Sequence, residues 1–406
     1  MHLGGSVHHQ LLKPCGLAAV CLSLCLSVPA FAADGEDDGP VTAVLGGRVN
    51  WDFASFNNDD RGTPNDDDTR FRRIWLDVSG KFYGFEYKAE IDLAGLQDEP
   101  GSAGIAARDV YITKAFDSGI LTVGQFKQYF SLDDRTSSNY GQFLERGYGA
   151  SNLASTYRKG VSWQAVLPHG TWAASAYSLE TIDNSRSKGK AIGGRGTWLP
   201  LDQGTSLRHL GLSLAHEAFD HPGTDGAATL RVQPGPENDL AVNSEVTLAR
   251  FNAGRDTDVD KWAVEYAEVR GPWSWQGEFI GGVYDDGAQR ATVTSTYGFV
   301  SWFATGESRS YDRKTGRFGR IKSINHKAGA LELALRYDRM DGEQHLIGGA
   351  DTIDASTEAW TLGANWYLTP NLRLMVNLID SRNRDQRTAT TLDHTRAITG
   401  RFQYDF

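Results

Sequence analysis

Apolar and polar residues alternate with a period of two along most of this chain. In residues 85–93, apolar side chains occupy the odd positions and charged side chains occupy the even positions. Residues 372–379 alternate in a similar way. This alternation is typical of half-buried β-strands. Segments of about ten residues suit a transmembrane β-barrel, although the strands of a soluble β-sandwich alternate as well. No later stretch holds 18 consecutive apolar residues, so no transmembrane helix is predicted there.

Sixteen such segments follow one another, and an even number of strands is typical of bacterial single-chain barrels. The predicted strands are 44–54, 71–80, 84–94, 106–115, 119–127, 157–166, 171–180, 190–199, 206–219, 259–270, 273–283, 293–304, 327–338, 356–368, 372–380 and 396–406. Parity assigns the short connections to the periplasmic side. The longer, outer connections are 55–70, 95–105, 128–156, 181–189, 220–258, 284–292, 339–355 and 381–395. One connection of periplasmic parity, 305–326, is long.

Two further features favour a membrane barrel over a soluble sandwich. Tryptophans stand near strand ends on the apolar faces, where aromatic girdles lie; they are Trp51, Trp273, Trp275, Trp360 and Trp366. The chain stops at Phe406, with aromatic residues two and four positions earlier, and this ending resembles the C-terminal signal of outer-membrane barrels. We therefore predict an all-β fold, a 16-stranded antiparallel transmembrane β-barrel over residues 44–406. Sixteen strands leave an aqueous channel.

The first residues have the pattern of an export signal. An apolar run over residues 16–29 is followed by the small-residue cleavage pattern Ala30-Phe31-Ala32. The alternative, an N-terminal membrane anchor, is weaker because a spanning helix needs about 20 apolar residues. We predict a signal peptide over residues 1–32 and an N-terminal tail over 33–43.

Composition excludes several classes of function. The formal net charge is -10, and a chain this acidic is a poor candidate for binding nucleic acid. All three cysteines lie in the first 25 residues, which argues against a disulfide framework, thiolate catalysis and a cysteine-ligated metal in the mature chain. No nucleophile elbow, P-loop or dinucleotide motif is found, so we expect no enzyme activity, no cofactor and no metal site.

Several segments are similar to one family of Gram-negative outer-membrane proteins, the phosphate-selective porins O and P. They are Gly47-Arg48-Val49, Arg72-Arg73, Val123 to Lys127 with Phe130-Ser131-Leu132, Thr305 to Arg309 with Tyr311-Asp312, Asn365 to Leu368, and Arg401 to Phe406. The resemblance implies an outer-membrane homotrimer whose loops fold into each lumen, and an arginine- and lysine-lined constriction for anions such as phosphate. It also implies insertion by the barrel-assembly machinery and contact with lipopolysaccharide.

The basic constriction implied by the resemblance corresponds to Arg48, Arg72, Arg73 and Lys127. Alternation points Arg48 and Arg73 into the lumen, whereas Arg72 has lipid-side parity and needs a bulge to turn inward. Parity does not place Lys127. The alternative for each is a solvated wall charge paired with a wall carboxylate, of which Asp52, Asp77 and Glu86 are the candidates.

The long connection of periplasmic parity holds the densest basic cluster. Its members are Arg309, Arg313, Lys314, Arg317, Arg320 and Lys322. The resemblance favours a second anion site inside the lumen on the periplasmic side, and the alternative is a solvated turn.

One region departs from the phosphate-selective pattern, which implies several closely spaced arginines in the outer connection 220–258. That connection has only three arginines and seven carboxylates. Two other functions therefore stay open beside a small-anion channel. One is a general or cation-tolerant porin on the same scaffold, and the other is an adhesin that acts through its outer loops.

Overall fold

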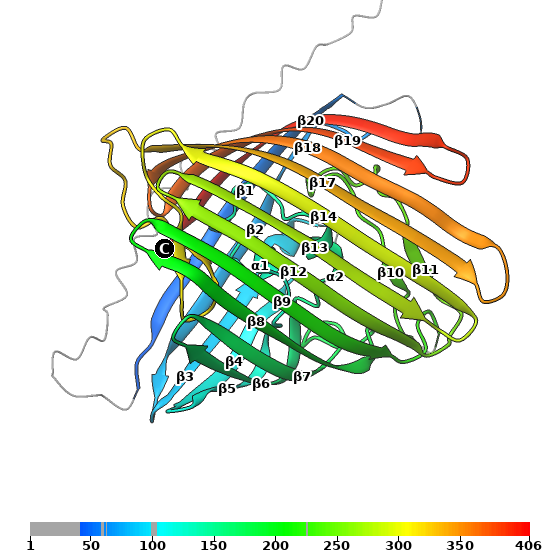
Figure 1. The fold of residues 1–406 in the computed structure, drawn as a ribbon, viewed down its shortest axis with the longest axis horizontal. Coiled ribbons are helices and arrows are strands. Elements are labelled where there is room, and N and C mark those ends of the chain that lie inside the picture. The colour runs from blue at the N-terminus through cyan, green and yellow to red at the C-terminus, as the bar shows by residue number, and fades with distance from the viewer. Residues whose placement is uncertain (1–40, 58–60, 62, 99–103, 225) are drawn as a thin grey trace, which may run out of the picture. The chain divides into compact units, whose positions relative to one another are not determined.

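The structure, a computed structural model, describes residues 41–57, 61, 63–98, 104–224 and 226–406. Within these ranges, sixteen antiparallel strands form one closed barrel, and β1 pairs with β20 to complete the ring (Figure 1). The predicted 16-stranded antiparallel barrel is confirmed. The predicted signal peptide, 1–32, and residues 33–40 of the predicted tail lie outside the described residues.

The barrel strands match the predicted segments one to one. They are β1 (Val44–Asn57), β2 (Asp68–Phe82), β3 (Phe85–Asp92), β4 (Ala106–Phe116), β5 (Gly119–Lys127), β6 (Tyr157–Leu167), β7 (Gly170–Ser178), β8 (Gly189–Gln203), β9 (Ser206–Phe219), β12 (Thr257–Arg270), β13 (Trp273–Asp285), β14 (Gln289–Phe303), β17 (Ala330–Leu346), β18 (Asp351–Thr369), β19 (Leu372–Asp385) and β20 (Thr390–Asp405).

The connections carry the remaining elements. They are the hairpins β10 (Leu230–Val232) with β11 (Ala249–Phe251) and β15 (Ser310–Asp312) with β16 (Arg317–Gly319), the helices α1 (Leu132–Arg135) and α2 (Tyr148–Leu153), and a 3₁₀ turn at Ala94–Gln97. In the described part of the chain, no helix is long and apolar enough to cross a membrane.

Two outer connections are much shorter than predicted. The expected connections 339–355 and 381–395 are largely strand, because β17, β18, β19 and β20 continue as paired ladders to tight turns. The outward face of these strand ends is mostly polar, so the apolar alternation stops while the backbone pairing continues. The β17–β18 hairpin projects at the end of the barrel opposite the C-terminus (Figure 1).

The two faces of the wall differ as the alternation predicts. The five tryptophans of the predicted girdles are all exposed on the outside, Trp360 at 54% and Trp51 at 48%. Between them, inward side chains such as Arg373 and Asn377 are buried. An apolar outer face with a polar interior is the arrangement of a transmembrane barrel around a hydrophilic lumen.

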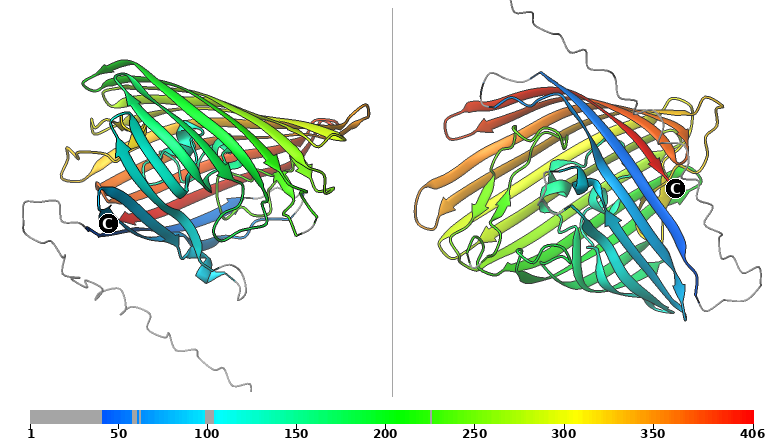
Figure 2. Two further views of the ribbon diagram at one scale, coloured as in Figure 1. Left: turned by 90° about the horizontal axis from the view of Figure 1, so that it is seen from below. Right: turned by 180° about the vertical axis from the view of Figure 1, so that it is seen from behind.

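Three connections contribute buried residues to the interior of the barrel, and the two helices of connection 128–156 are seen inside it in Figure 2. Connections 128–156 and 220–256 pack together against the inner wall, with Phe130, Tyr148, Leu248 and Phe251 among the buried residues. The connection 304–329 starts at the periplasmic end of the barrel and contacts connection 128–156 inside the lumen. Its buried residues Tyr311 and Phe318 cluster with Leu132 and with the wall.

Candidate functional site

The lumen site is built around connection 128–156, whose two short helices are held by wall carboxylates. Glu278 on β13 accepts hydrogen bonds from the backbone N–H groups of Leu132 (3.0 Å) and Asp133 (2.7 Å) at the start of α1. Asp338 on β17 accepts one from the N–H of Tyr148 (2.6 Å) at the start of α2. Acceptors at a helix start satisfy N–H groups that have no partner within the helix.

Between the helices, the backbone of residues 141–145 is held by donors on β17–β20. The bonds are from Arg373 to the carbonyl of Gly141 (2.7 Å), from Asn365 to Gln142 (2.9 Å), from Arg401 to Leu144 (2.6 Å) and from Arg336 to Glu145 (3.1 Å). A loop whose backbone carbonyls are satisfied in this way is fixed across the lumen.

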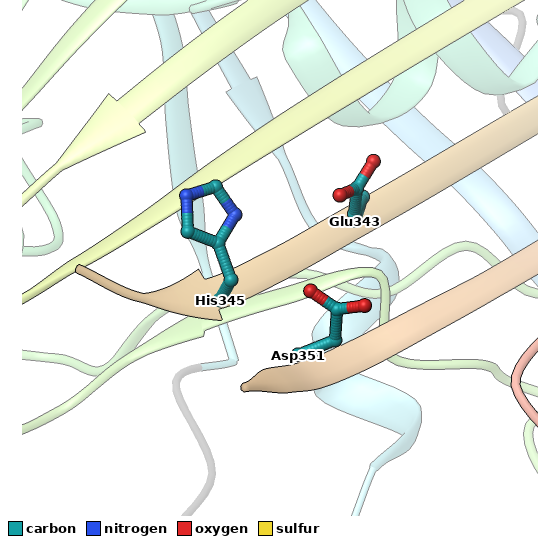
Figure 3. Close-up of side chains that lie close together, drawn as sticks. All are labelled: Glu343, His345 and Asp351. Atoms are coloured by element: carbon teal, nitrogen blue, oxygen red, sulfur yellow. The ribbon is translucent and has the colours of Figure 1, made fainter. Parts of the chain in front are cut away.

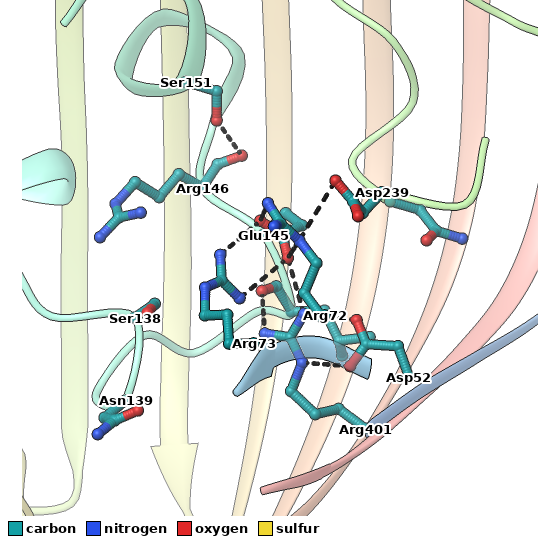
Figure 4. Close-up of polar contacts among 12 residues, drawn as sticks. Asp52, Arg72, Arg73, Ser138, Asn139, Glu145, Arg146, Ser151, Asp239 and Arg401 are labelled. Carbon is teal, nitrogen blue, oxygen red and sulfur yellow. Dashed lines mark hydrogen bonds and ion pairs between the residues drawn. The ribbon is translucent and has the colours of Figure 1, made fainter. Parts of the chain in front are cut away.

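The carboxylate of Glu145 lies where three arginines converge (Figure 4). Arg401 donates to it at 2.7 Å, Arg72 at 3.1 and 3.3 Å, and Arg73 at 3.2 and 3.4 Å. We call these three side chains with Glu145 the arginine cage. Burial alone would raise the pKa of Glu145, but the charges of the three arginines outweigh it and hold that pKa well below its usual range.

A bulge brings Arg72 into this cage and corrects its predicted lipid-side parity. Asn50 of β1 pairs with Arg73, but the next residue, Trp51, pairs with Phe71, so Arg72 is the extra residue on β2. The bulge turns the Arg72 side chain to the lumen, beside Arg73.

The cage is locally neutral. Asp52 accepts two bonds from Arg401, both 2.6 Å long, and Asp239 of connection 220–256 lies 3.3 Å from Arg72. With Glu145, three carboxylates therefore balance the three arginines. The predicted alternative named Asp52, Asp77 and Glu86 as partners of the four basic residues, but the ion pairs of the described residues join none of them to these carboxylates. Asp52 pairs with Arg401 instead, and Glu145 and Asp239 come from inserted loops.

Arg48 and Lys127 also lie in the lumen, but outside the cage. Arg48 stacks on Trp75, 3.8 Å from the ring centre, and donates to Ser138 (2.8 Å) and Asn139 (3.0 Å). Lys127 donates to the Asp134 carbonyl (2.7 Å) and lies 3.1 Å from its carboxylate. Arg48 therefore faces neutral acceptors, whereas Lys127 holds the loop.

The periplasmic-side basic residues do not form one cluster. Arg309 is the most deeply placed: it lies over the Phe318 ring at 3.5 Å and donates to Gln276 (3.1 Å). Burial lowers the pKa of Arg309 to about 10, so it remains a cation at neutral pH. The others diverge: Arg313 pairs with Asp202, Arg320 with Asp405, and Arg317 donates to the Arg135 carbonyl, while Lys314 and Lys322 are exposed. Arg309 thus lies inside the lumen, whereas Lys314 and Lys322 are solvated, and an anion site in this block stays a prediction.

Four important residues were not among the predicted ones: Arg401, Glu145, Arg336 and Glu237, the last two forming a buried ion pair. Parity could have placed Arg401, because it alternates with the outward Phe402 and Tyr404. Glu145 and Glu237 lie in loops without periodicity, so no signal in the sequence points to them.

Two small cavities lie along the lumen, each of about 20 Å³, which is room for about one water. The first is lined by Arg73, Ser137, Ser138, Glu145 and Arg146, among others. The second lies toward the periplasmic connection, with Arg309 and Arg320 in its lining, and both touch Gln142.

Among the described residues, one group could offer ligands to a metal ion. Ligand atoms of Glu343, His345 and Asp351 all lie within 4.8 Å of one another at the end of the β17–β18 hairpin (Figure 3). Glu343 and Asp351 are exposed, and the inward neighbour Gln344 is buried, so the group is on the outer face. It takes no part in the lumen site.

Comparison with known proteins agrees with this architecture. The family model of the phosphate-selective porins O and P matches residues 44–406. Porin O of Pseudomonas aeruginosa is 25% identical over 433 residues, covering 96% of this chain and 98% of its own.

Two solved structures share the fold at low sequence identity. The trimer form of the outer-membrane protein OmpT of Vibrio cholerae has a TM-score of 0.57 at 10% identity, with 91% of this chain and 100% of that chain covered. The anion-selective porin from Comamonas acidovorans has a TM-score of 0.56 at 14% identity, with coverages of 90% and 100%. This chain is therefore an outer-membrane porin and belongs to the phosphate-selective porin O and P family.

Proposed function

We propose that this porin is a passive channel for small anions, with phosphate and related oxyanions as its preferred substrates. The observation that carries the proposal is that guanidinium groups along the lumen donate to neutral acceptors. Arg48 donates to Ser138 and Asn139, and Arg309 donates to Gln276. Such groups keep positive charge to offer a passing anion, and the planar fork of arginine suits oxyanions.

The relatives support this proposal in two ways. The family's own description is phosphate-selective, and one structural relative is described as anion-selective. Ser137 and Ser138 line the cavity beside Arg73, where their hydroxyls add neutral hydrogen-bond donors for phosphate oxygens.

A second candidate function, a general porin of weak selectivity, is favoured by the neutral arginine cage. Asp239 and Glu237 of connection 220–256 compensate Arg72 and Arg336. A field summed over paired charges attracts anions less than the number of arginines suggests.

Reversal potentials of single channels in planar bilayers under a KCl gradient, followed by titration with phosphate, separate the two functions. Chloride preference with block of the chloride current by phosphate is the expected result. Equal permeation of both ions without phosphate block would favour the general porin.

We also propose that the porin is a homotrimer. The trimer form of the Vibrio cholerae relative supports this assembly. Cross-linking in mild detergent should give a three-chain product. The barrel-assembly machinery and lipopolysaccharide remain predicted partners.

A further inference from the structure

The arginine cage already holds an anion, and that anion belongs to the protein. The carboxylate of Glu145 receives hydrogen bonds from Arg72, Arg73 and Arg401 (Figure 4). A carboxylate presents two oxygens to guanidinium forks much as an oxyanion does. Any role of this internal anion in permeation rests on the proposed passage of small anions.

The three arginines differ in how far they depend on Glu145. Arg401 is saturated, because it also makes two bonds of 2.6 Å to Asp52 and one to the Leu144 carbonyl. Arg72 has a second carboxylate at 3.3 Å, that of Asp239. The polar contacts found for Arg73 among the described residues are all with Glu145. If the carboxylate moves away, Arg73 is the cation left without a counter-charge.

The bonds between Arg73 and Glu145 are also loose. They measure 3.2 and 3.4 Å, whereas charge-assisted bonds of this kind are commonly about 2.7–2.9 Å long. By comparison, the two bonds between Arg401 and Asp52 in the same cage are each 2.6 Å long. Glu145 is thus held tightly by Arg401 on one side and weakly by Arg73 on the other.

Space beside Arg73 is limited. The cavity lined by Arg73, Ser137, Ser138 and Glu145 measures about 20 Å³, close to the volume that one water needs. An anion as large as phosphate gains room against the Arg73 guanidinium in this cavity if it takes the place of the Glu145 carboxylate.

We propose that Glu145 is a tethered competitor of the permeating anion, and that small oxyanions pass the arginine cage by exchanging with its carboxylate on Arg73. Because the carboxylate competes for Arg73, the oxyanion is not bound so tightly by the arginines that it cannot leave. An entering oxyanion displaces the Glu145 carboxylate, and the carboxylate, kept nearby by Arg401, then displaces the oxyanion. A channel needs such balance, because binding must be strong enough for entry and weak enough for release.

The test compares wild type with Glu145→Gln in planar bilayers and in solution. The glutamine side chain has nearly the same shape as glutamate but carries no charge, so it does not compete with phosphate for Arg73. We expect phosphate to block the chloride current of Glu145→Gln at concentrations lower by about tenfold. The reason is that phosphate no longer has to displace a charge-assisted contact between residue 145 and Arg73. Phosphate should also raise the unfolding temperature of Glu145→Gln more than that of wild type, because a tighter ligand stabilises the folded state more.

Glu237→Gln is the matched control, since it removes one carboxylate from another buried lumen arginine, Arg336. An equal gain in phosphate affinity in both variants would overturn local exchange and indicate a general effect of lumen charge. The double variant Arg73→Gln/Glu145→Gln should lose the gain, because Arg73 is the proposed receiver.

The outcomes separate this inference from the proposed function. If wild type is blocked by phosphate and Glu145→Gln is blocked no better, the tethered competitor is wrong while the anion channel stands. If only Glu145→Gln shows anion preference, the competitor stands and wild type is a general porin. If neither shows it, both proposals fail. Should Glu145→Gln not fold, Arg73→Gln alone still decides, because phosphate block that persists without Arg73 overturns the exchange.

Discussion

Two groups of arginines in this molecule behave differently in the structure. Arg72, Arg73 and Arg401 come from neighbouring parts of the wall, on β2 and β20, and converge on one carboxylate. The arginines of connection 304–329 are closer together in the chain, yet each finds a separate acceptor. Strand register brings charges together whatever their separation in sequence, whereas a loop with many charges spreads them apart.

The largest expected effect in this comparison is the loss of Arg401. Arg401→Ala leaves Asp52 as a buried charge without its partner, and breaking such a pair costs about 3–5 kcal/mol. We expect a large drop in the free energy of unfolding, measured by denaturant titration of the barrel in detergent micelles.

Arg320→Ala is the matched control from the other group. Arg320 also pairs with a buried carboxylate, that of Asp405, but its own side chain is 34% exposed. Water can replace it, so its loss should cost about 1 kcal/mol or less. Equal losses in the two variants would show that convergence on the wall adds nothing to stability.

The next effect concerns ion selectivity. Arg73→Gln should weaken phosphate block by about tenfold, because one charge-assisted contact with the anion is lost. Arg313→Gln should change it less than about twofold, since Arg313 is exposed and paired with Asp202. Reversal potentials and phosphate titrations on single channels measure both. A larger effect at Arg313 would make the periplasmic connection the selective element.

A smaller effect depends on pH. Because the pKa of Glu145 is held well below its usual range, its carboxylate stays charged as the pH falls from 7 to about 5. Its contribution to stability is present above the ordinary pKa of about 4.3 and is lost only as the pH falls through the lowered value. The difference in unfolding temperature between wild type and Glu145→Gln should therefore be constant from pH 7 to 5 and shrink in stronger acid. A difference in unfolding temperature that already shrinks at pH 6 would show that the three arginines do not lower the pKa of Glu145.

The smallest expected effect is at Lys322. Its side chain is exposed in the periplasmic connection, so Lys322→Gln should change the free energy of unfolding by less than about 0.5 kcal/mol and leave the reversal potential unchanged. A shift in reversal potential would show that this connection contributes to selectivity through its exposed charges.

The sequence predicts the strands of the barrel wall better than the loops inside the lumen, because only the strands are periodic. Alternation suffices to count sixteen strands and to point Arg48 and Arg73 inward, since each wall residue has only two directions available. The bulge at Arg72 breaks that rule with one extra residue, which alternation cannot place. Glu145 lies in a loop whose path depends on the wall donors to its backbone, and these become neighbours only when the barrel closes.

The seam between β1 and β20 gives the pore an order of assembly. Asp52 on β1 and Arg401 on β20 are 349 positions apart, and the backbone of Phe406 pairs with that of Gly47. Contacts between such distant parts of a chain form late in folding, because a long loop must first be closed. The arginine cage thus comes into being only when the first and last strands have met. An unfinished barrel would lack this cage, so the charges that line the finished lumen are brought together only after the wall is sealed.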